Sequence, residues 1–402
     1  MTSPFSHEVA LLGLIFALMV VPRLLQRWRL PAPLTSFTLG MTASLMLAES
    51  GQDATLGLLA TLGISSLFLF AGLEVDLRDF QRGRWPLVRH VVIRLLVIGG
   101  AAYALMGYFG FTWRVATLLS LALFTPSAGF ILDTLPALKL TEDERFWVRM
   151  KAISGELLAL VLLFVVLQSS SVETFLGSSA ALAAMAIGLP LLLLALGRYV
   201  VPYARGSEFS LLVMVGVISA YLSYLIGVYY LVGAFLAGFV ARLLHRRLPT
   251  LASGDNLHAV RMFASFFVPF YFFYKGMGVP HDALTPQALW LGLGLTAIVI
   301  PFRIGLQWLQ RRLIAGETAM GSLRVAVALS PTLIFTLVLA GIARERFGIS
   351  DQFYAALLVY AACATILPSL FMARGVELDV DMLPNTRFGQ EEDAPTTGER
   401  AR

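Results

Sequence analysis

Long apolar stretches separated by short polar loops follow one another along almost the whole chain. A helix needs about 20 residues to cross a bilayer core about 30 Å thick, and these stretches approach that length. Only 14% of the residues are charged and 58% are hydrophobic, whereas a soluble domain carries roughly 25% charge. The sequence therefore predicts an all-α polytopic membrane protein.

About thirteen stretches meet the length requirement for transmembrane helices. They cover approximately residues 7–26, 31–48, 55–76, 86–109, 114–137, 145–168, 176–198, 207–225, 228–244, 259–279, 286–308, 319–343 and 352–373. We expect residues 1–373 to form a single transmembrane domain. The tail at 374–402 is polar and acidic, a composition typical of disordered segments, and we expect it to be disordered.

The basic residues of the loops predict the orientation of the chain. Loops that follow odd-numbered stretches are rich in arginine, as in Arg23, Arg27, Arg29, Arg242, Arg246 and Arg247. Loops that follow even-numbered stretches carry only Arg114, Arg344 and Arg346. Because basic loops stay on the cytoplasmic side, we expect the N-terminus outside and the C-terminus in the cytoplasm, in a bacterial inner (plasma) membrane.

Several classes of protein are not supported by the sequence. We find no nucleophile–base pair, no metal-ligand constellation and no phosphate-binding loop, so an enzyme is not expected. The single cysteine, Cys363, excludes a disulfide framework and a cysteine-based zinc site. The net charge of +5 comes from loop residues that set topology, so a nucleic-acid partner is not expected. Neither a cofactor nor an attached nucleotide-binding domain is expected.

Two of the apolar stretches are interrupted by a proline between hydroxyl residues. The first break is Thr125-Pro126-Ser127, and the second, about 205 residues later, is Ser330-Pro331-Thr332. Proline removes a helical hydrogen bond and clashes with the preceding turn, and in lipid the freed carbonyls need new partners. One such site is typical of a simple kink. Two at matching places favour unwound helices that cross.

A similar offset relates other parts of the two halves. LFLFAGLEV contains Gly72, and YFFYKGMGV, about 204 residues later, contains Gly276. An offset of seven spans, an odd number, places the two repeats in opposite orientations in the membrane. Inverted repeats with two discontinuous helices are typical of secondary transporters.

Crossed half-helices bring like partial charges together, because each helix end carries about half a unit charge. The ionisable residues available to offset them within the membrane are Glu156, Lys275, Arg303 and Asp133. Glu156 lies near the middle of its span, where a carboxylate costs a few kcal/mol unless it is paired, protonated or hydrated. A carboxyl at that depth is a functional candidate, with a structural ion pair as the alternative.

Glu156 can bind either a proton or a monovalent cation, because burial raises a carboxyl pKa and a nearby cation lowers it. Na⁺ and K⁺ prefer oxygen ligands. We expect these from the backbone carbonyls at the breaks and from Ser154, Thr125, Ser127, Ser330 and Thr332. Competition between proton and cation at Glu156 predicts a secondary active antiporter that works by alternating access.

The other charged residues have two interpretations each. Arg303 either pairs with Glu156 or extends to the membrane interface, and the same alternatives hold for Lys275. Glu74 and Asp76 either bond to Arg78 or Arg82 at the interface, or line a cytoplasmic funnel that attracts cations. Asp133 is expected at the end of its helix, at the cytoplasmic mouth of the same funnel.

The motifs around these residues resemble the second monovalent cation:proton antiporter family, which includes the Kef-type potassium efflux proteins. The resemblance covers the chain to about residue 373 and rests on LFLFAGLEVDLRDF at 67–80, GVYYLVGAFLAGFVA at 227–241 and FFVPFYFFYKGMGV at 266–279. It implies a homodimer whose core helices, about 55–168 and 259–373, move against the remaining helices, which form a dimerisation scaffold. It also places the transport acid at Glu156 and its basic partner at Arg303.

This chain departs from the family pattern at two places. The family usually has Asp preceded by Asp, Asn or Gln where this chain has Gly155-Glu156, and it often has Gly-Glu where this chain has Pro331-Thr332. The missing second acid favours electroneutral exchange of one Na⁺ or K⁺ for one proton. It also leaves two alternatives open, namely a proton-coupled transporter of an anion or small organic acid, and a gated channel or sensor.

Overall fold

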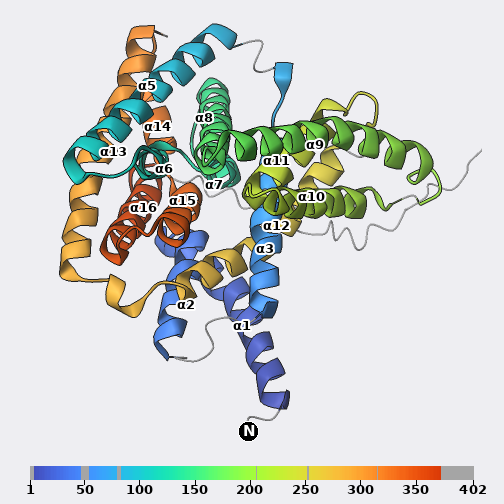
Figure 1. Cartoon of the computed structure of the whole chain (residues 1–402), viewed down its shortest axis with the longest axis horizontal. Coiled ribbons are helices and arrows are strands. Elements are labelled where there is room, and N and C mark those ends of the chain that lie inside the picture. The colour runs from blue at the N-terminus through green and yellow to red at the C-terminus, as the bar shows by residue number, and fades with distance from the viewer. Residues whose placement is uncertain are drawn as a thin grey trace, which may run out of the picture.

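The computed structural model describes residues 4–46, 54–78, 83–204, 206–250, 253–314 and 316–372, so the acidic tail lies outside the described residues. The main elements are helices: α1 (Pro4–Leu25), α2 (Ala32–Met46), α3 (Ala54–Leu73), α5 (Arg84–Phe109), α6 (Trp113–Phe124), α7 (Ala128–Thr134), α8 (Glu142–Gln168), α9 (Val172–Tyr199), α10 (Glu208–Leu225), α11 (Tyr230–Leu243), α12 (Gly254–Met277), α13 (Pro286–Ile314), α14 (Ala319–Ala328), α15 (Leu333–Phe347) and α16 (Asp351–Phe371) (Figure 1). The expected all-α architecture is confirmed.

Ten helical segments of the described chain are long and apolar enough to cross a membrane, and one of them joins α6 and α7. The bent pair α14 and α15, whose axes differ by 44°, raises the number to eleven. Helix α11 is apolar but shorter, with 14 residues, and α2 has 15. Each expected stretch therefore coincides with a helix or a broken pair, while the total of thirteen spans stays a prediction.

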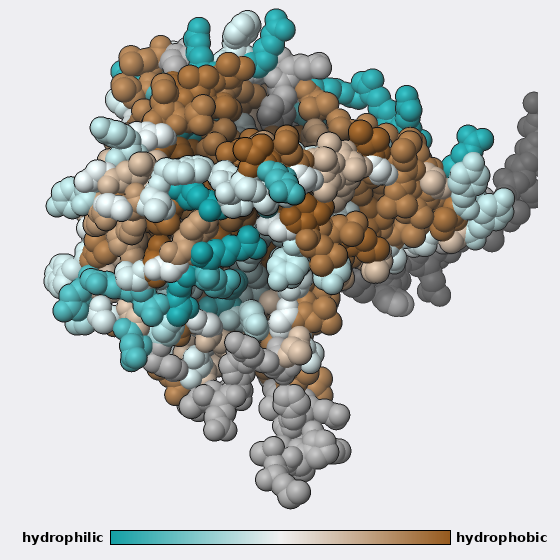
Figure 2. Space-filling model, viewed as in Figure 1, coloured by the Kyte–Doolittle hydropathy of each residue, from teal (hydrophilic) through white to brown (hydrophobic). Residues whose placement is uncertain are grey.

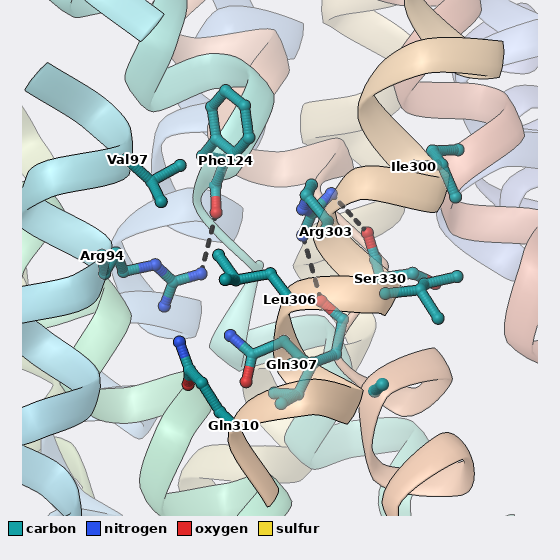
Figure 3. Close-up of a pocket in the computed structure, with 12 residues that line it drawn as sticks. Arg94, Val97, Phe124, Ile300, Arg303, Leu306, Gln307, Gln310 and Ser330 are labelled. Carbon is teal, nitrogen blue, oxygen red and sulfur yellow. Dashed lines mark hydrogen bonds between the residues drawn. The ribbon is translucent and has the colours of Figure 1, made fainter. Parts of the chain in front are cut away.

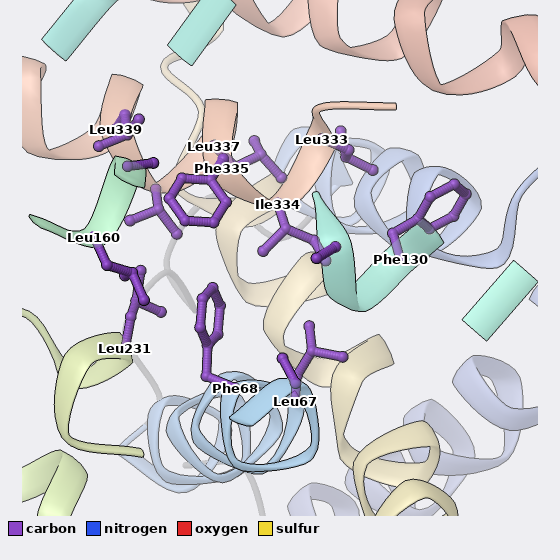
Figure 4. Close-up of a cluster of buried hydrophobic side chains, with 14 of the residues drawn as sticks. Leu67, Phe68, Phe130, Leu160, Leu231, Leu333, Ile334, Phe335, Leu337 and Leu339 are labelled. Atoms are coloured by element: carbon purple, nitrogen blue, oxygen red, sulfur yellow. The ribbon is translucent and has the colours of Figure 1, made fainter. Parts of the chain in front are cut away.

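The helices gather into two groups. Helices α5, α8, α13 and α16 pack around the two broken pairs, α6–α7 and α14–α15, and α2, α3, α10, α11 and α12 pack against one another beside them (Figure 1). Helices α3 and α12 pack most extensively against each other, and next against α11 and α2 respectively. The expected division into core helices and a dimerisation scaffold stays a prediction. Where the two groups meet, Phe68 of α3 contacts Phe335 of α15 edge to face, with ring centroids 5.8 Å apart (Figure 4).

Glycines allow α3 and α11 to cross in close contact. A Cβ atom at Gly72 would lie 2.2 Å from the carbonyl oxygen of Phe235, and one at Gly238 would lie 2.1 Å from that of Leu69. Small residues at such crossings let the backbones of membrane helices approach. The glycines of the motifs at 67–80 and 227–241 therefore serve packing.

The crossing of α2 and α12 repeats this arrangement. A Cβ atom at Gly276 would lie 2.1 Å from the carbonyl oxygen of Phe37, and one at Gly40 would lie 2.0 Å from that of Phe273. Gly276 and Phe273 each follow their counterparts in α3, Gly72 and Leu69, by about 204 positions. This offset nearly equals the one between the two proline breaks, which supports the expected internal repeat.

Hydrophobic side chains cover much of the molecular surface over α5, α9 and α13 (Figure 2). Tyr103, Ile187, Trp290 and Ile298 are among the exposed ones. A water-soluble monomer rarely presents a continuous apolar surface of this extent. The surface therefore fits contact with lipid.

Candidate functional site

The two breaks lie against one another at the centre of the first helix group. The chain is unwound between α6 and α7, and again between α14 and α15. The backbone N–H of Ser127 donates to the carbonyl of Pro331 at 2.9 Å. The N–H groups of Ile334 and Phe335 donate to the Ser127 hydroxyl at 3.0 and 3.3 Å. The expected crossing of two discontinuous helices at Pro126 and Pro331 is confirmed.

Side chains of the second repeat also bond the carbonyls at the end of α6. The Thr336 hydroxyl donates to the carbonyl of Ala122 at 2.8 Å, and the Tyr360 hydroxyl donates to that of Leu123. These carbonyls belong to the last turn of a helix, where no intrahelical donor remains. The first break is thus completed by residues from α15 and α16.

Arg303 of α13 binds the end of α14. Its Nη1 donates to the carbonyl of Ser330 at 3.0 Å (Figure 3). Nη1 also donates to the Tyr360 hydroxyl at 2.8 Å, and Nη2 donates to the carbonyl of Leu329 at 3.1 Å. The expected ion pair with Glu156 is not among the contacts of the described residues. The negative carbonyl end of the half-helix takes the guanidinium instead.

Arg94 of α5 plays the matching role in the first repeat, and the sequence reasoning missed it. Its Nη2 donates to the carbonyl of Phe124, the last residue of α6, at 2.8 Å (Figure 3). A Cβ atom at residue 155 would lie 1.8 Å from Arg94 Nη1, so Gly155 provides the space that the guanidinium fills. The repeat offset was the available signal, because subtracting about 205 from 303 gives a position one helical turn from Arg94.

Lys275 also lies away from Glu156. Its Nζ is 3.9 Å from the Glu345 carboxylate, at the end of α12 and beside α15. The expected pairing of Lys275 with Glu156 is therefore not observed either. A lysine at a helix end extends its ammonium towards water, which explains this position.

Glu156 is buried in α8, with an exposed fraction of 2%. One carboxyl oxygen interacts with the backbone N–H of Ala128, directly after the first break. The other, Oε2, has no hydrogen-bond partner among the described residues. A buried acceptor without a partner costs about 1–3 kcal/mol, so this oxygen is open for a proton or a cation.

The hydroxyls near the breaks fall into two groups. Ser127, Ser330 and Ser154 are already engaged with the backbone, the last two through the carbonyls of Ala364 at 3.1 Å and Lys151 at 3.2 Å. The Thr125 hydroxyl is fully buried and has no partner in the part of the chain that the structure describes. Thr332 is also fully buried, in the second break. Thr125 thus offers the clearest additional oxygen for a cation.

A cavity of about 350 Å³ opens beside α7, lined by Asp133, Arg261 and apolar side chains of α1, α3 and α12. The carboxylate of Asp133 lies 3.3 Å from Nη2 of Arg261, which joins α7 to α12. The cavity reaches Gly129 and Phe130, next to the first break. Asp133 is thus at this cavity, whereas Glu74 and Asp76 are not among its lining residues, and the cytoplasmic funnel stays a prediction.

Glu74 and Asp76, which follow α3, have opposite environments. Asp76 accepts the backbone N–H of Arg78 at 2.9 Å and pairs with Arg242 at 3.0 Å, and these contacts lower its pKa. Burial raises the pKa of Glu74, against the attraction of nearby arginines. The ion pair of Asp76 is therefore with the side chain of Arg242, whereas the sequence suggested Arg78 or Arg82. Arg82 lies outside the described residues.

Because the pKa of Glu74 is raised, we expect Glu74→Gln to change the stability of the protein in a pH-dependent way. A carboxyl whose pKa is higher in the folded state contributes stability that is complete at low pH and is lost as the pH rises through the folded value. We expect the unfolding temperature of Glu74→Gln to rise relative to wild type as the pH increases above about 4, the ordinary pKa of a glutamate carboxyl.

Thermal unfolding of purified protein measures this difference. Asp76→Asn is the control with the opposite sign, because a lowered carboxyl pKa contributes stability above the unfolded value. If the unfolding temperatures of wild type and Glu74→Gln change in parallel with pH, the raised pKa of Glu74 is contradicted.

Comparison with known proteins identifies the family. Residues 13–374 match the model of the family described as "Sodium/hydrogen exchanger, transmembrane". A protein of Methanocaldococcus jannaschii named "Probable Na(+)/H(+) antiporter 3" is 25% identical over 379 residues, covering 89% of this chain and 93% of that protein. The solved structure of the sodium proton antiporter MjNhaP1 from the same organism, at pH 8, has the same fold: the TM-score is 0.63 at 14% identity, over 91% of this chain and 95% of the other. The chain therefore belongs to the sodium/hydrogen exchanger family.

Proposed function

We propose that this cation:proton exchanger moves Na⁺ against protons and that both bind at Glu156. The observation that supports this most directly is the buried carboxylate oxygen without a partner beside the crossing of the two broken helices. Ion and substrate sites of transporters with inverted repeats lie at such breaks. Sodium is the cation in the names of both relatives.

The exchange results from competition between Na⁺ and a proton for the two carboxyl oxygens of Glu156. Protonated Glu156 is neutral and crosses the membrane with the moving helices. After the proton leaves, the carboxylate binds Na⁺, with the Thr125 hydroxyl and nearby backbone carbonyls as further oxygen ligands. Both loaded forms of the site are neutral, so one Na⁺ exchanges for one proton without net charge movement.

Other details of the proposal come from the sequence. The narrower resemblance to the Kef-type family stays a prediction, and it keeps K⁺ as a second candidate cation. We also propose a homodimer in a bacterial inner membrane, with the N-terminus outside and the C-terminus in the cytoplasm. Transport of an anion or organic acid and a gated channel or sensor, which the sequence left open, are not favoured by the family match.

Reconstitution of the wild type in liposomes tests the proposal. With a pH-sensitive dye inside the vesicles and an imposed pH gradient, we expect added Na⁺ to dissipate the gradient saturably. Li⁺ and K⁺ added in turn give the selectivity, and a voltage-sensitive dye should show no net charge movement. Proton flux that no monovalent cation changes would overturn the proposal.

A further inference from the structure

A small cavity between α5 and α13 has no role in the exchange described above. Its volume is about 30 Å³, and it is lined by Arg94, Arg303, Gln307, Gln310 and by side chains of α6 and α14. A cavity needs at least about 10–15 Å³ to hold a water molecule, so this one has room for one small ion or one to two waters.

The polar atoms that face this cavity are hydrogen-bond donors. Gln307 uses its Oε1 to accept from Lys151 Nζ at 3.0 Å, and Gln310 directs its Oε1 to His90 Nδ1 at 3.2 Å. Both amide NH₂ groups therefore point the other way, and Figure 3 shows their nitrogens facing Arg94. An amide has two donors and one acceptor oxygen, so each glutamine offers the cavity only donors.

Arg94 brings an unpartnered donor, packed beside Gly155, to the edge of this space. Its Nη2 binds the carbonyl of Phe124, but its Nη1 is buried and has no hydrogen-bond partner among the described residues. The whole side chain is 8% exposed. Figure 3 shows Nη1 on the side of the guanidinium that faces Gln307 and Gln310. A buried N–H of a charged group without a partner is costly, and an anion would satisfy it.

The charges around the cavity leave a positive excess. Arg94 and Arg303 carry two unit charges, and the half-helix ends that they bind supply about half a negative unit each. No carboxylate lines the cavity. Under the proposed exchange, the Glu156 site is neutral whether it holds a proton or Na⁺, so it does not offset the remaining positive charge, to which the Lys151 ammonium at Gln307 adds.

We propose that this cavity binds one small monovalent anion of the halide class between Arg94 Nη1 and the amide groups of Gln307 and Gln310. The anion stays bound and is not transported. It neutralises the centre of the moving helix group, where a net charge would be costly in lipid. The volume admits chloride or bromide and excludes a polyatomic anion such as gluconate.

Equilibrium binding of ³⁶Cl⁻ to the purified full-length protein in detergent tests this site. We expect saturable binding of one chloride per chain, displaced by bromide and unaffected by gluconate. Gln310→Glu places a carboxylate at the anion position and should weaken chloride binding by at least about tenfold. Gln287→Glu, an exposed position on the same helix, makes the same chemical change away from the cavity and should leave binding unaltered.

Crystals grown in bromide give a test that needs no variant. An anomalous peak between Arg94 Nη1 and the two amide nitrogens is expected. Water alone at that position, or chloride binding that Gln310→Glu does not change, would overturn the proposal. Neither experiment depends on cation exchange, so a failure here leaves the proposed function standing, and a failure of the exchange assay leaves this site standing.

Discussion

Glu156→Gln is expected to fold and to lose cation:proton exchange completely, to the level of protein-free liposomes. The amide has the shape of a protonated carboxyl, so packing in α8 is preserved. It neither releases a proton at neutral pH nor provides the charge that balances a bound Na⁺. The measurement is Na⁺-driven dissipation of a pH gradient in proteoliposomes, with the unfolding temperature recorded in parallel.

Glu173→Gln is the matched control for this result, because Glu173 is exposed in the first turn of α9. It makes the same chemical change and should exchange like wild type. Saturable Na⁺-driven proton flux in Glu156→Gln, well above the liposome background, would show that another group carries the proton.

Arg303→Ala is expected to have the second-largest effect, a loss of stability together with a loss of exchange. The substitution removes the donor from three buried acceptors, the carbonyls of Leu329 and Ser330 and the hydroxyl of Tyr360. Each unsatisfied group costs about 1–3 kcal/mol. We therefore expect a clear drop in the unfolding temperature of the purified protein and little remaining flux.

Two variants sharpen this prediction. Arg303→Lys keeps the charge but not the forked donor geometry, so its stability should be intermediate. Arg312→Ala, an exposed position on the same helix, should resemble wild type. If Arg303→Ala instead keeps its unfolding temperature and only shifts the pH optimum of exchange, Arg303 acts on the charge of Glu156 and not on the end of α14.

The positions of the breaks and of the buried acid could be predicted from the sequence. A proline inside an apolar stretch removes a hydrogen bond wherever the helix lies, so Pro126 and Pro331 identify the breaks without a structure. A carboxyl in the middle of a span is equally conspicuous, as Glu156 was. Both signals depend only on neighbouring residues in the chain, so they can be recognised without a structure.

The partners of the charged residues could not be predicted in the same way. Whether Arg303 meets Glu156 or the end of α14 depends on where two helices cross, and no spacing in the chain encodes that geometry. Charge alone favoured the carboxylate, but the free carbonyls of a broken helix compete for the same guanidinium. Arg94 was overlooked because it follows the basic residues Arg89 and His90, which resemble the end of a span.

The hydrogen bonds that join the two breaks also constrain how the protein is made. The hydroxyl of Ser127 bonds to the backbone of Ile334, which is 207 positions later in the chain. At a synthesis rate of about 5–20 residues per second, the first break waits about 10–40 s for these partners. During that time the polar groups around Ser127 lack the partners that they have in the folded protein. The first crossing helix therefore reaches its final hydrogen bonding only after the second repeat has been synthesised.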